Sequence, residues 1–134
     1  MWEAGNTFDG NVIKTAGNHL HIVLSDPYTS ENGESVVLVY MSTYRGACRT
    51  EEDSCILDIG DHSYITGRSY LVYSECKEVP VSVLDRELQK ETIKLRDSLS
   101  KKILVKALEG MQKSKYVSRK LKKKTSKLLF DLID

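Results

Sequence analysis

The spacing of apolar residues changes at Pro80, and this change most limits what the chain can fold into. Before Pro80, apolar residues alternate with polar ones or form short unbroken runs, which is typical of strands. After it they recur at steps of three to five residues, as in an amphipathic helix. The sequence therefore predicts a β domain over residues 1–80 and a basic helical segment over residues 81–134.

Two stretches of the first part give the clearest strand signals. In "HLHIVLSDP" (19–27), Leu20, Ile22 and Leu24 share one face, and Val23 lies on the other. The nearly continuous apolar run "VVLVYMST" (36–43) predicts a strand buried on both faces.

Further β-prone runs, "CILDI" and "SYLVYSECKEV", follow beyond a polar loop. Together the runs predict about five or six short strands. Closing a small sheet on itself hides its edges, so we expect a small SH3-like β-barrel. The fold class is mainly β with C-terminal helices, and the apolar spacing predicts two helices, at about residues 82–110 and 113–132.

Charge is divided unevenly along the chain. Residues 1–100 carry 9 Lys+Arg and 16 Asp+Glu, a net charge of −7, whereas residues 101–134 carry 11 and 3, a net charge of +8. The segment 113–124 has seven basic residues and no acidic one. We expect it to need an anionic partner, which is RNA, an acidic protein or the acidic body of the chain itself.

Histidine is the usual general acid or base near neutral pH, and the chain has three, at positions 19, 21 and 62. Metal-independent RNA cleavage needs a base for the 2′-hydroxyl, an acid for the leaving oxygen and a cation for the phosphorane. His19, Asp61, His62 and Arg68 provide such a set, and we expect Asp61 and His62 to lie in a turn that faces the same cleft as His19, Ser42 and Thr43. The candidate RNA-binding residues are Ser42, Thr43, Arg45, Ser69, Tyr70, Lys120, Lys122, Lys123 and Lys124.

Each of these residues also has a structural interpretation. Asp61 can cap a turn by bonding its own backbone, with Gly60 supplying a positive φ angle. His19 can be a solvated residue at the start of a strand. The basic segment can be the solvated face of a helix, and tyrosines in a β protein often serve packing alone.

No cofactor or metal site is expected. The cysteines at positions 48, 55 and 76 have no CxxC spacing, so neither a zinc site nor a disulfide framework is indicated. We expect Cys55 and Cys76 to pack as small apolar residues in strands, and Cys48 to lie in a polar loop. The chain has no apolar run of membrane-spanning length and no secretory signal, which predicts a cytoplasmic protein without membrane contact.

Three stretches resemble the PemK/MazF-type plasmid-maintenance toxins, which are endoribonucleases on an SH3-like barrel. "GNTFDG…AGNHLHIVLSDP" is similar to that family's opening strand pair, "VVLVYMST" to its next buried strand, and "RSYLVYSECKEV" to its late strand, together covering about residues 5–80. The resemblance implies RNA as substrate, a cognate antitoxin protein as partner, and a homodimer.

The sequence departs from the family pattern at its cationic positions. His19-Leu20 stands where the family has Arg-Pro, and Lys77 is the nearest match to the late basic residue. Two readings follow: the chemistry is recast onto His19, Asp61, His62 and Arg68, or the barrel no longer cuts. A non-catalytic SH3-like module that binds nucleic acid or protein, and a phage-defence accessory protein, are the alternative functions.

Overall fold

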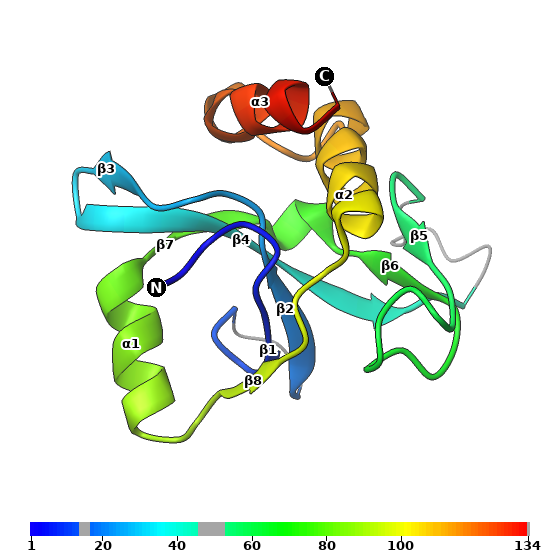
Figure 1. Cartoon of the computed structure of the whole chain (residues 1–134), viewed down its shortest axis with the longest axis horizontal. Coiled ribbons are helices and arrows are strands. Elements are labelled where there is room, and N and C mark those ends of the chain that lie inside the picture. The colour runs from blue at the N-terminus through cyan, green and yellow to red at the C-terminus, as the bar shows by residue number, and fades with distance from the viewer. Residues whose placement is uncertain (14–16, 46–52, 134) are drawn as a thin grey trace.

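The computed structural model describes residues 1–13, 17–45 and 53–133, and Cys48 lies outside them. An antiparallel sheet forms the body, and helices lie against it (Figure 1). The strands are β1 (Thr7–Gly10), β2 (His19–Val23), β3 (Tyr28–Ser30), β4 (Gly33–Thr43), β5 (Ile56–Leu57), β6 (Ser69–Leu71), β7 (Lys77–Pro80) and β8 (Lys94–Arg96). The helices are the 3-10 turn η1 (Tyr73–Glu75), α1 (Val81–Gln89), α2 (Lys101–Lys113) and α3 (Arg119–Ile133).

The long strand β4 organises the sheet. It pairs antiparallel with β2, β3, β6 and β7, and the main strand order is β5-β6-β4-β2-β1-β8. A turn at Glu31-Asn32, followed by Gly33 at φ +90°, joins β3 to β4 at the predicted turn signal. The expected mainly β fold followed by helices is confirmed. Closure of these strands into an SH3-like barrel stays a prediction.

Alternate side chains of β4 enter two different cores. Val37, Val39 and Met41 join one cluster with α2, and Val36 and Leu38 join another with α1. We call these the α2-side core and the α1-side core. The prediction that residues 36–43 form a strand buried on both faces is therefore confirmed over its apolar part, Val36–Val39. Figure 1 shows the corresponding layers, with α1 at the lower left and α2 and α3 at the top.

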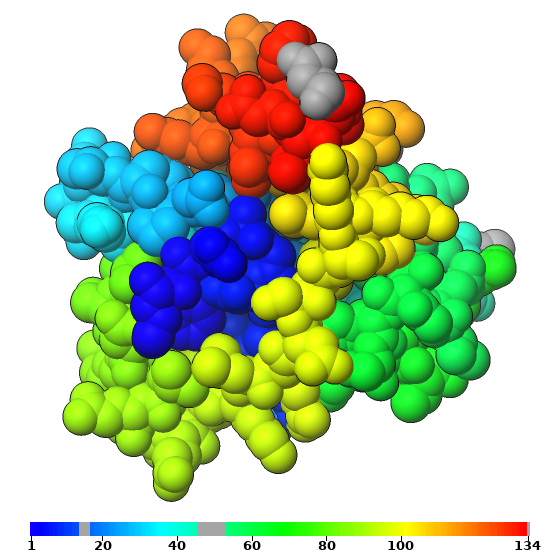
Figure 2. Space-filling view, in the orientation of Figure 1, coloured from blue at the N-terminus to red at the C-terminus, as the bar shows by residue number. Residues whose placement is uncertain are grey.

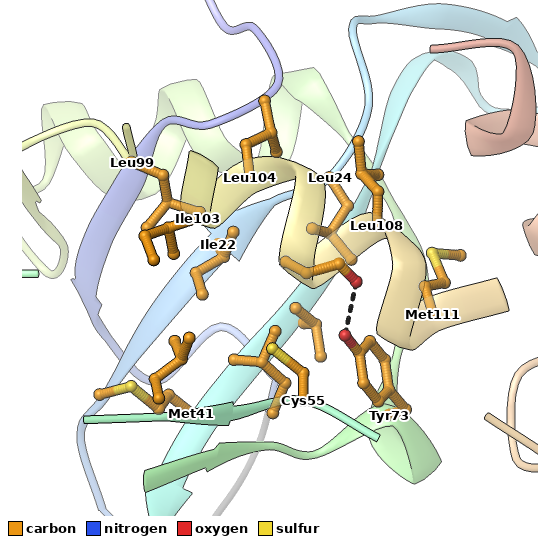
Figure 3. Close-up of a cluster of buried hydrophobic side chains, with 14 of the residues drawn as sticks. Ile22, Leu24, Met41, Cys55, Tyr73, Leu99, Ile103, Leu104, Leu108 and Met111 are labelled. Carbon is orange, nitrogen blue, oxygen red and sulfur yellow. Dashed lines mark hydrogen bonds between the residues drawn. The ribbon is translucent and has the colours of Figure 1, made fainter. Parts of the chain in front are cut away.

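The side chains of β2 and of Leu24, the residue that follows it, also alternate between the two cores. Leu20, Ile22 and Leu24 contribute to the α2-side core, whereas Val23 belongs to the α1-side core, as their alternation predicted. Figure 3 shows the α2-side core, where the Tyr73 hydroxyl donates a 2.5 Å hydrogen bond to the carbonyl oxygen of Ala107 in α2. This bond connects α2 to η1 within the α2-side core.

The predicted helix over residues 82–110 is wrong, because the chain returns to the sheet in the middle of it. Helix α1 ends at Gln89, and Glu91 adopts φ +61°. The Thr92 backbone N–H and hydroxyl both donate to the carbonyl of Glu87, which satisfies a free carbonyl at the helix end. The next residues form β8, which pairs with β1, and α2 begins only after Ser100 caps it through the Ile103 N–H.

The start of the last helix also needs correction. Helix α3 begins at Arg119 and not at residue 113, because Ser114 and Val117 are buried in the connection from α2. The stretch "YITGRSYLVYSECKEV", which was expected to hold one or two strands, holds two, because η1 separates β6 from β7. The structure thus has eight strands and three α-helices in its described part, where about five or six strands and two helices were expected.

Gly110 allows α2 to approach the sheet closely, and its replacement tests this contact. An added Cβ would lie 2.6 Å from the Tyr73 hydroxyl and 2.7 Å from the Ser54 carbonyl. Alanine is the better helix former by about 1 kcal/mol, but overpacking outweighs this gain. We expect Gly110→Ala to lower the free energy of unfolding by about 1–3 kcal/mol in urea titrations.

Gly17→Ala is the matched control, since its Cβ would meet nothing within 4 Å. A Gly110→Ala protein as stable as the wild type would contradict the close packing of α2.

Candidate functional site

A groove of about 530 Å³ lies where β2 begins and β4 ends. Three segments line it: residues 18–20 at the start of β2, residues 41–43 and 45 at the end of β4, and residues 64–67 and 69 in the segment that leads into β6. It collects five of the residues expected at a site. These are His19, Ser42, Thr43, Arg45 and Ser69.

His19 is held in one orientation at the edge of this groove. Its Nδ1 lies 3.0 Å from the carbonyl oxygen of Met41, and because a carbonyl only accepts, Nδ1 carries the proton. The ring also packs against Tyr40 at a centroid distance of 4.8 Å. In the neutral ring, Nε2 is therefore the basic nitrogen, as a general base requires.

Hydroxyl groups and a guanidinium line the same groove as His19. Ser42 pairs with Tyr70 and Thr43 with Ser69 across β4 and β6, which brings three of the hydroxyl residues of the groove, Ser42, Thr43 and Ser69, onto neighbouring strands. Ser69 is nearly buried, and its hydroxyl donates to the Gly67 carbonyl at 2.9 Å. Arg45 is exposed at the rim. Hydroxyls and a cation are the groups that hold a phosphate.

The groove has an apolar floor and one aromatic wall. Leu20, Met41 and Ile65 are buried and supply the floor. Tyr64 lines the wall; its hydroxyl donates to Asp9 Oδ1 at 3.1 Å, and the Arg96 guanidinium lies 5.4 Å from its ring centroid. Burial, followed by the bond to Asp9, raises the pKa of the Tyr64 hydroxyl, so this group is held as a neutral donor.

The expectation that His62 faces the same groove as His19 is wrong. His62 is 6% exposed and lies outside the groove lining. Its Nε2 donates to the carbonyl of Asp97 at 2.6 Å, and its Nδ1 accepts the backbone N–H of Tyr64 at 3.0 Å. Both ring nitrogens are thus bonded: Nε2 fastens the segment after β5 to the chain next to β8, and Nδ1 holds the turn within that segment.

The register of β1 and β2 also separates the two histidines. His62 bonds to Thr7, which pairs with Ile22, whereas His19 pairs with Gly10. Three residues along a strand correspond to about 10 Å.

Asp61, Arg68 and Tyr70 also lie outside the groove lining. Asp61 accepts the backbone N–H of Asp58 at 2.8 Å, and Gly60 has φ +102°, so the structural interpretation of this turn is confirmed. Arg68 forms an exposed ion pair with Asp58 at 2.9 Å, and this bond raises its pKa. Tyr70 is nearly buried and packs edge-on against Tyr44.

The basic candidates lie on α3, away from the groove. Lys120, Lys123 and Lys124 are exposed, and Lys122 is half-buried. The Lys124 ammonium lies 4.6 Å from the ring centroid of Tyr28, whose hydroxyl bonds to Glu78. This contact connects α3 to the hairpin of β3 and β4.

His21 lies within the α1-side core and has a structural role. It is fully buried, stacks on Phe8 at 4.9 Å and donates from Nδ1 to the His19 carbonyl. Its Nε2 accepts the Ile13 backbone N–H at 3.2 Å. Burial lowers the pKa of His21 from its usual 6.5 to about 4, opposed by its bond to the His19 carbonyl.

Within the described residues, no group of three or more His, Cys, Asp or Glu side chains is placed to hold a metal ion. In the same part of the chain, no helix combines the length and the apolar character needed to cross a membrane. Cys55 is a buried thiol whose pKa burial raises to about 11, and it packs in the α2-side core as a small apolar residue. Comparisons with protein-family models, curated proteins and solved structures found no match for this chain.

Sequence reasoning missed some of the groove. Asn18 and Thr66 line it but stood out in no pattern, although Asn18 directly precedes His19. Arg96 and Asp9, which hold Tyr64, come from strands that meet only in the folded sheet. The pairing of β1 with β8 would have shown that Asp9 and Arg96 lie close together. The sequence predicted a helix for residues 94–96, so this pairing was not expected.

The two bonds of His62 predict a loss of stability when it is replaced. His62→Leu leaves the Tyr64 N–H without its acceptor, so we expect the free energy of unfolding to fall by about 1–3 kcal/mol. His62→Gln, which retains a donor and an acceptor, should recover part of this loss in the same urea titration. Unchanged stability in both variants would contradict the anchoring role.

The lowered pKa of His21 predicts a pH dependence of stability. Between about pH 6.5 and about pH 4 the unfolded chain binds a proton at His21 that the folded chain does not bind, so stability falls as the pH falls through this window. Above about pH 6.5 the stabilisation is complete, and the total loss is on the order of 3 kcal/mol.

Urea unfolding of the wild type and of His21→Gln at several pH values isolates this contribution. Glutamine offers a donor and an acceptor but does not titrate, so the wild type should lose more stability than the variant on acidification. Equal losses would show that His21 does not carry the effect.

Proposed function

We propose that this protein is a metal-independent endoribonuclease of the PemK/MazF toxin-like type, with the groove at His19 as its active site. One observation carries the proposal. The Met41 carbonyl fixes the His19 ring through Nδ1, so that Nε2 is the basic nitrogen in a groove that also holds Ser42, Thr43 and Arg45. The apolar floor suits a base, and the hydroxyl and guanidinium groups suit its phosphate.

The proposed reaction uses the RNA itself as nucleophile. His19 Nε2 takes the proton of the 2′-hydroxyl, and the 2′-oxygen attacks the neighbouring phosphorus. The bond from phosphorus to the 5′-oxygen breaks, that oxygen takes a proton from water, and the hydroxide left behind takes the proton from His19, which restores the neutral ring. Arg45 and the hydroxyls of Ser42 and Thr43 stabilise the negative charge of the phosphorane. The products carry a 2′,3′-cyclic phosphate and a 5′-hydroxyl.

This assignment changes the catalytic set expected from the sequence. His19 remains the general base. Arg45, and not Arg68, is the cation that stabilises the phosphorane. Asp61 and His62 become structural residues of the segment that forms the far wall of the groove.

The wider biology follows from the resemblance alone. It favours a toxin that acts in the cytoplasm, forms a homodimer and is held inactive by a cognate antitoxin. An acidic antitoxin segment would compete with RNA for the same positive charges.

A second function, a non-catalytic module that binds single-stranded RNA, has one observation in its favour. Among the described residues that line the groove, His19 is the one histidine, and no carboxylate accompanies it. Cleavage of this kind normally uses both a base and an acid, so a groove with one titratable group is also consistent with binding alone.

Incubation of the purified protein with a long RNA in EDTA, followed by analysis of the product ends, tests the proposal. We expect cyclic or 3′-phosphate ends, and a loss of about 10²-fold or more in His19→Gln, because a general base is removed. Glutamine retains an N–H that can reach the Met41 carbonyl, so the melting temperature should change little.

Lys94→Gln, on the exposed face of β8, is the control and should cleave like the wild type. RNA binding without any cleavage would favour the module. Cleavage that requires Mg²⁺ and leaves 3′-hydroxyl ends would rule out the mechanism.

A further inference from the structure

The described C-terminal segment 101–133 has an unusual excess of positive charge. It carries eleven Lys and Arg against Glu109 and Asp131, a net charge of +9, on α2, α3 and their connection. Of these eleven, Lys127 is the one that forms an ion pair with a carboxylate among the described residues, at 3.3 Å from Asp131. These positive charges repel one another, and a polyanion that binds to them relieves the repulsion. Such a surface therefore attracts a polyanion.

Helix α3 holds its lysines in a fixed orientation. Its inward face packs against the α2-side core through Leu121, Leu128 and other leucines. Thr125 is fully buried and accepts a hydrogen bond from Gln112 of α2 at 3.2 Å. The exposed residues Lys120, Lys123 and Lys127 follow each other at steps of three and four, so they form a row on one side of the helix.

Helix α2 extends the positive surface. Lys101, Lys102 and Lys106, together with Val105 and Glu109, line an open hollow of about 520 Å³ on its outer face. Figure 2 shows α2, in yellow, and the end of α3, in red, next to each other on one face of the molecule. We call the outward faces of these two helices the basic surface.

We infer that the basic surface is a second nucleic-acid-binding site, which contacts the phosphates of single-stranded RNA outside the groove. Lys124 rests on Tyr28, which pairs with Ser35 near the start of β4, whereas the groove begins at Met41. Six residues along a strand place this α3 part of the basic surface about 20 Å from the groove. One strand that occupies both sites must therefore be longer than one that fills the groove alone.

The composition of the basic surface favours RNA over a protein or a membrane. Ten of the eleven cations of segment 101–133 are lysines, and lysine is depleted in protein–protein interfaces, where arginine is enriched. A helix that lies on a membrane exposes a continuous apolar face. The leucines of α3 instead face the core, which leaves Phe130 and Ile133 as its exposed apolar side chains. The choice of a single strand rests on the proposed function, because the groove suits an unpaired base.

Binding of RNA of two lengths tests the inference. The probes are 2′-O-methyl strands of about 4 and about 16 nucleotides in EDTA, whose affinities are measured by fluorescence anisotropy over a range of salt concentrations. The variant is Lys120→Gln/Lys123→Gln/Lys127→Gln. It spares Lys124, which rests on Tyr28, and Lys122, whose side chain is half-buried.

We expect the triple variant to bind the long strand about 10-fold or more weakly at low salt. The slope of log affinity against log salt should fall by about 2, since each lost phosphate contact removes about 0.7. Its affinity for the short strand should be unchanged. Lys77→Gln/Lys90→Gln/Lys94→Gln removes the same charge from the exposed parts of β7, β8 and the end of α1, and should leave both affinities and slopes near the wild-type values.

Three results would overturn the inference. The first is that the triple variant loses equal affinity for the short and the long strand. The second is that the two triple variants lose equal affinity for the long strand. The third is that the wild type binds phosphatidylserine vesicles or polyglutamate as tightly as it binds the long strand. Because 2′-O-methyl RNA cannot be cleaved through its 2′-oxygen, this experiment is separate from the test of catalysis. A protein that fails to cut RNA but shows the length-dependent slope retains the second site and loses the proposed activity.

Discussion

The fold depends on one strand being buried on both of its faces. Residues Gly33–Thr43 of β4 pair with four other strands, and their alternate side chains enter two separate cores. Each core then needs its own cover, which α1 supplies on one face and α2 with α3 on the other. The end of the same strand supplies Met41, Ser42 and Thr43 to the groove, so the central element of the sheet also positions the candidate site.

The opposite wall of the groove depends on a strand that is only three residues long. Strand β8 pairs with β1 and places Arg96 beside Tyr64 and the Asp97 carbonyl beside His62. Ser63 adds a bond to the Asp97 carboxylate at 2.8 Å. The segment after β5 is thus fastened to the sheet by side chains, because it forms little regular structure of its own. Strand β8, although short and exposed, therefore fixes the position of the groove wall that contains Tyr64.

The three histidines have different roles because their ring nitrogens have different hydrogen-bond partners. His21 and His62 each have both ring nitrogens bonded and serve the fold. His19 uses Nδ1 for the Met41 carbonyl and lines a groove with hydroxyl groups. The difference arises because His21 points into the α1-side core and His62 into the contact with β8, whereas His19 stands at the open end of the sheet.

The sequence by itself determined the local features whose causes are local. The period-two alternation of Leu20, Ile22, Leu24 and Val23, the doubly buried run of β4 and the turn at Gly33 could all be predicted, because side-chain periodicity and backbone sterics act over a few residues. The positions of His19, Ser42 and Thr43 at strand ends also predicted that these three residues share one groove. Only the tertiary structure decided what depends on contacts between distant segments. Residues Lys94–Arg96 have helical spacing around them, yet pairing with β1 makes them a strand, since a ladder with a distant partner outweighs a weak local propensity. The same pairing removed His62 from the candidate active site, because its acceptor, the Asp97 carbonyl, lies 35 residues away in the chain and exists there only in the folded protein.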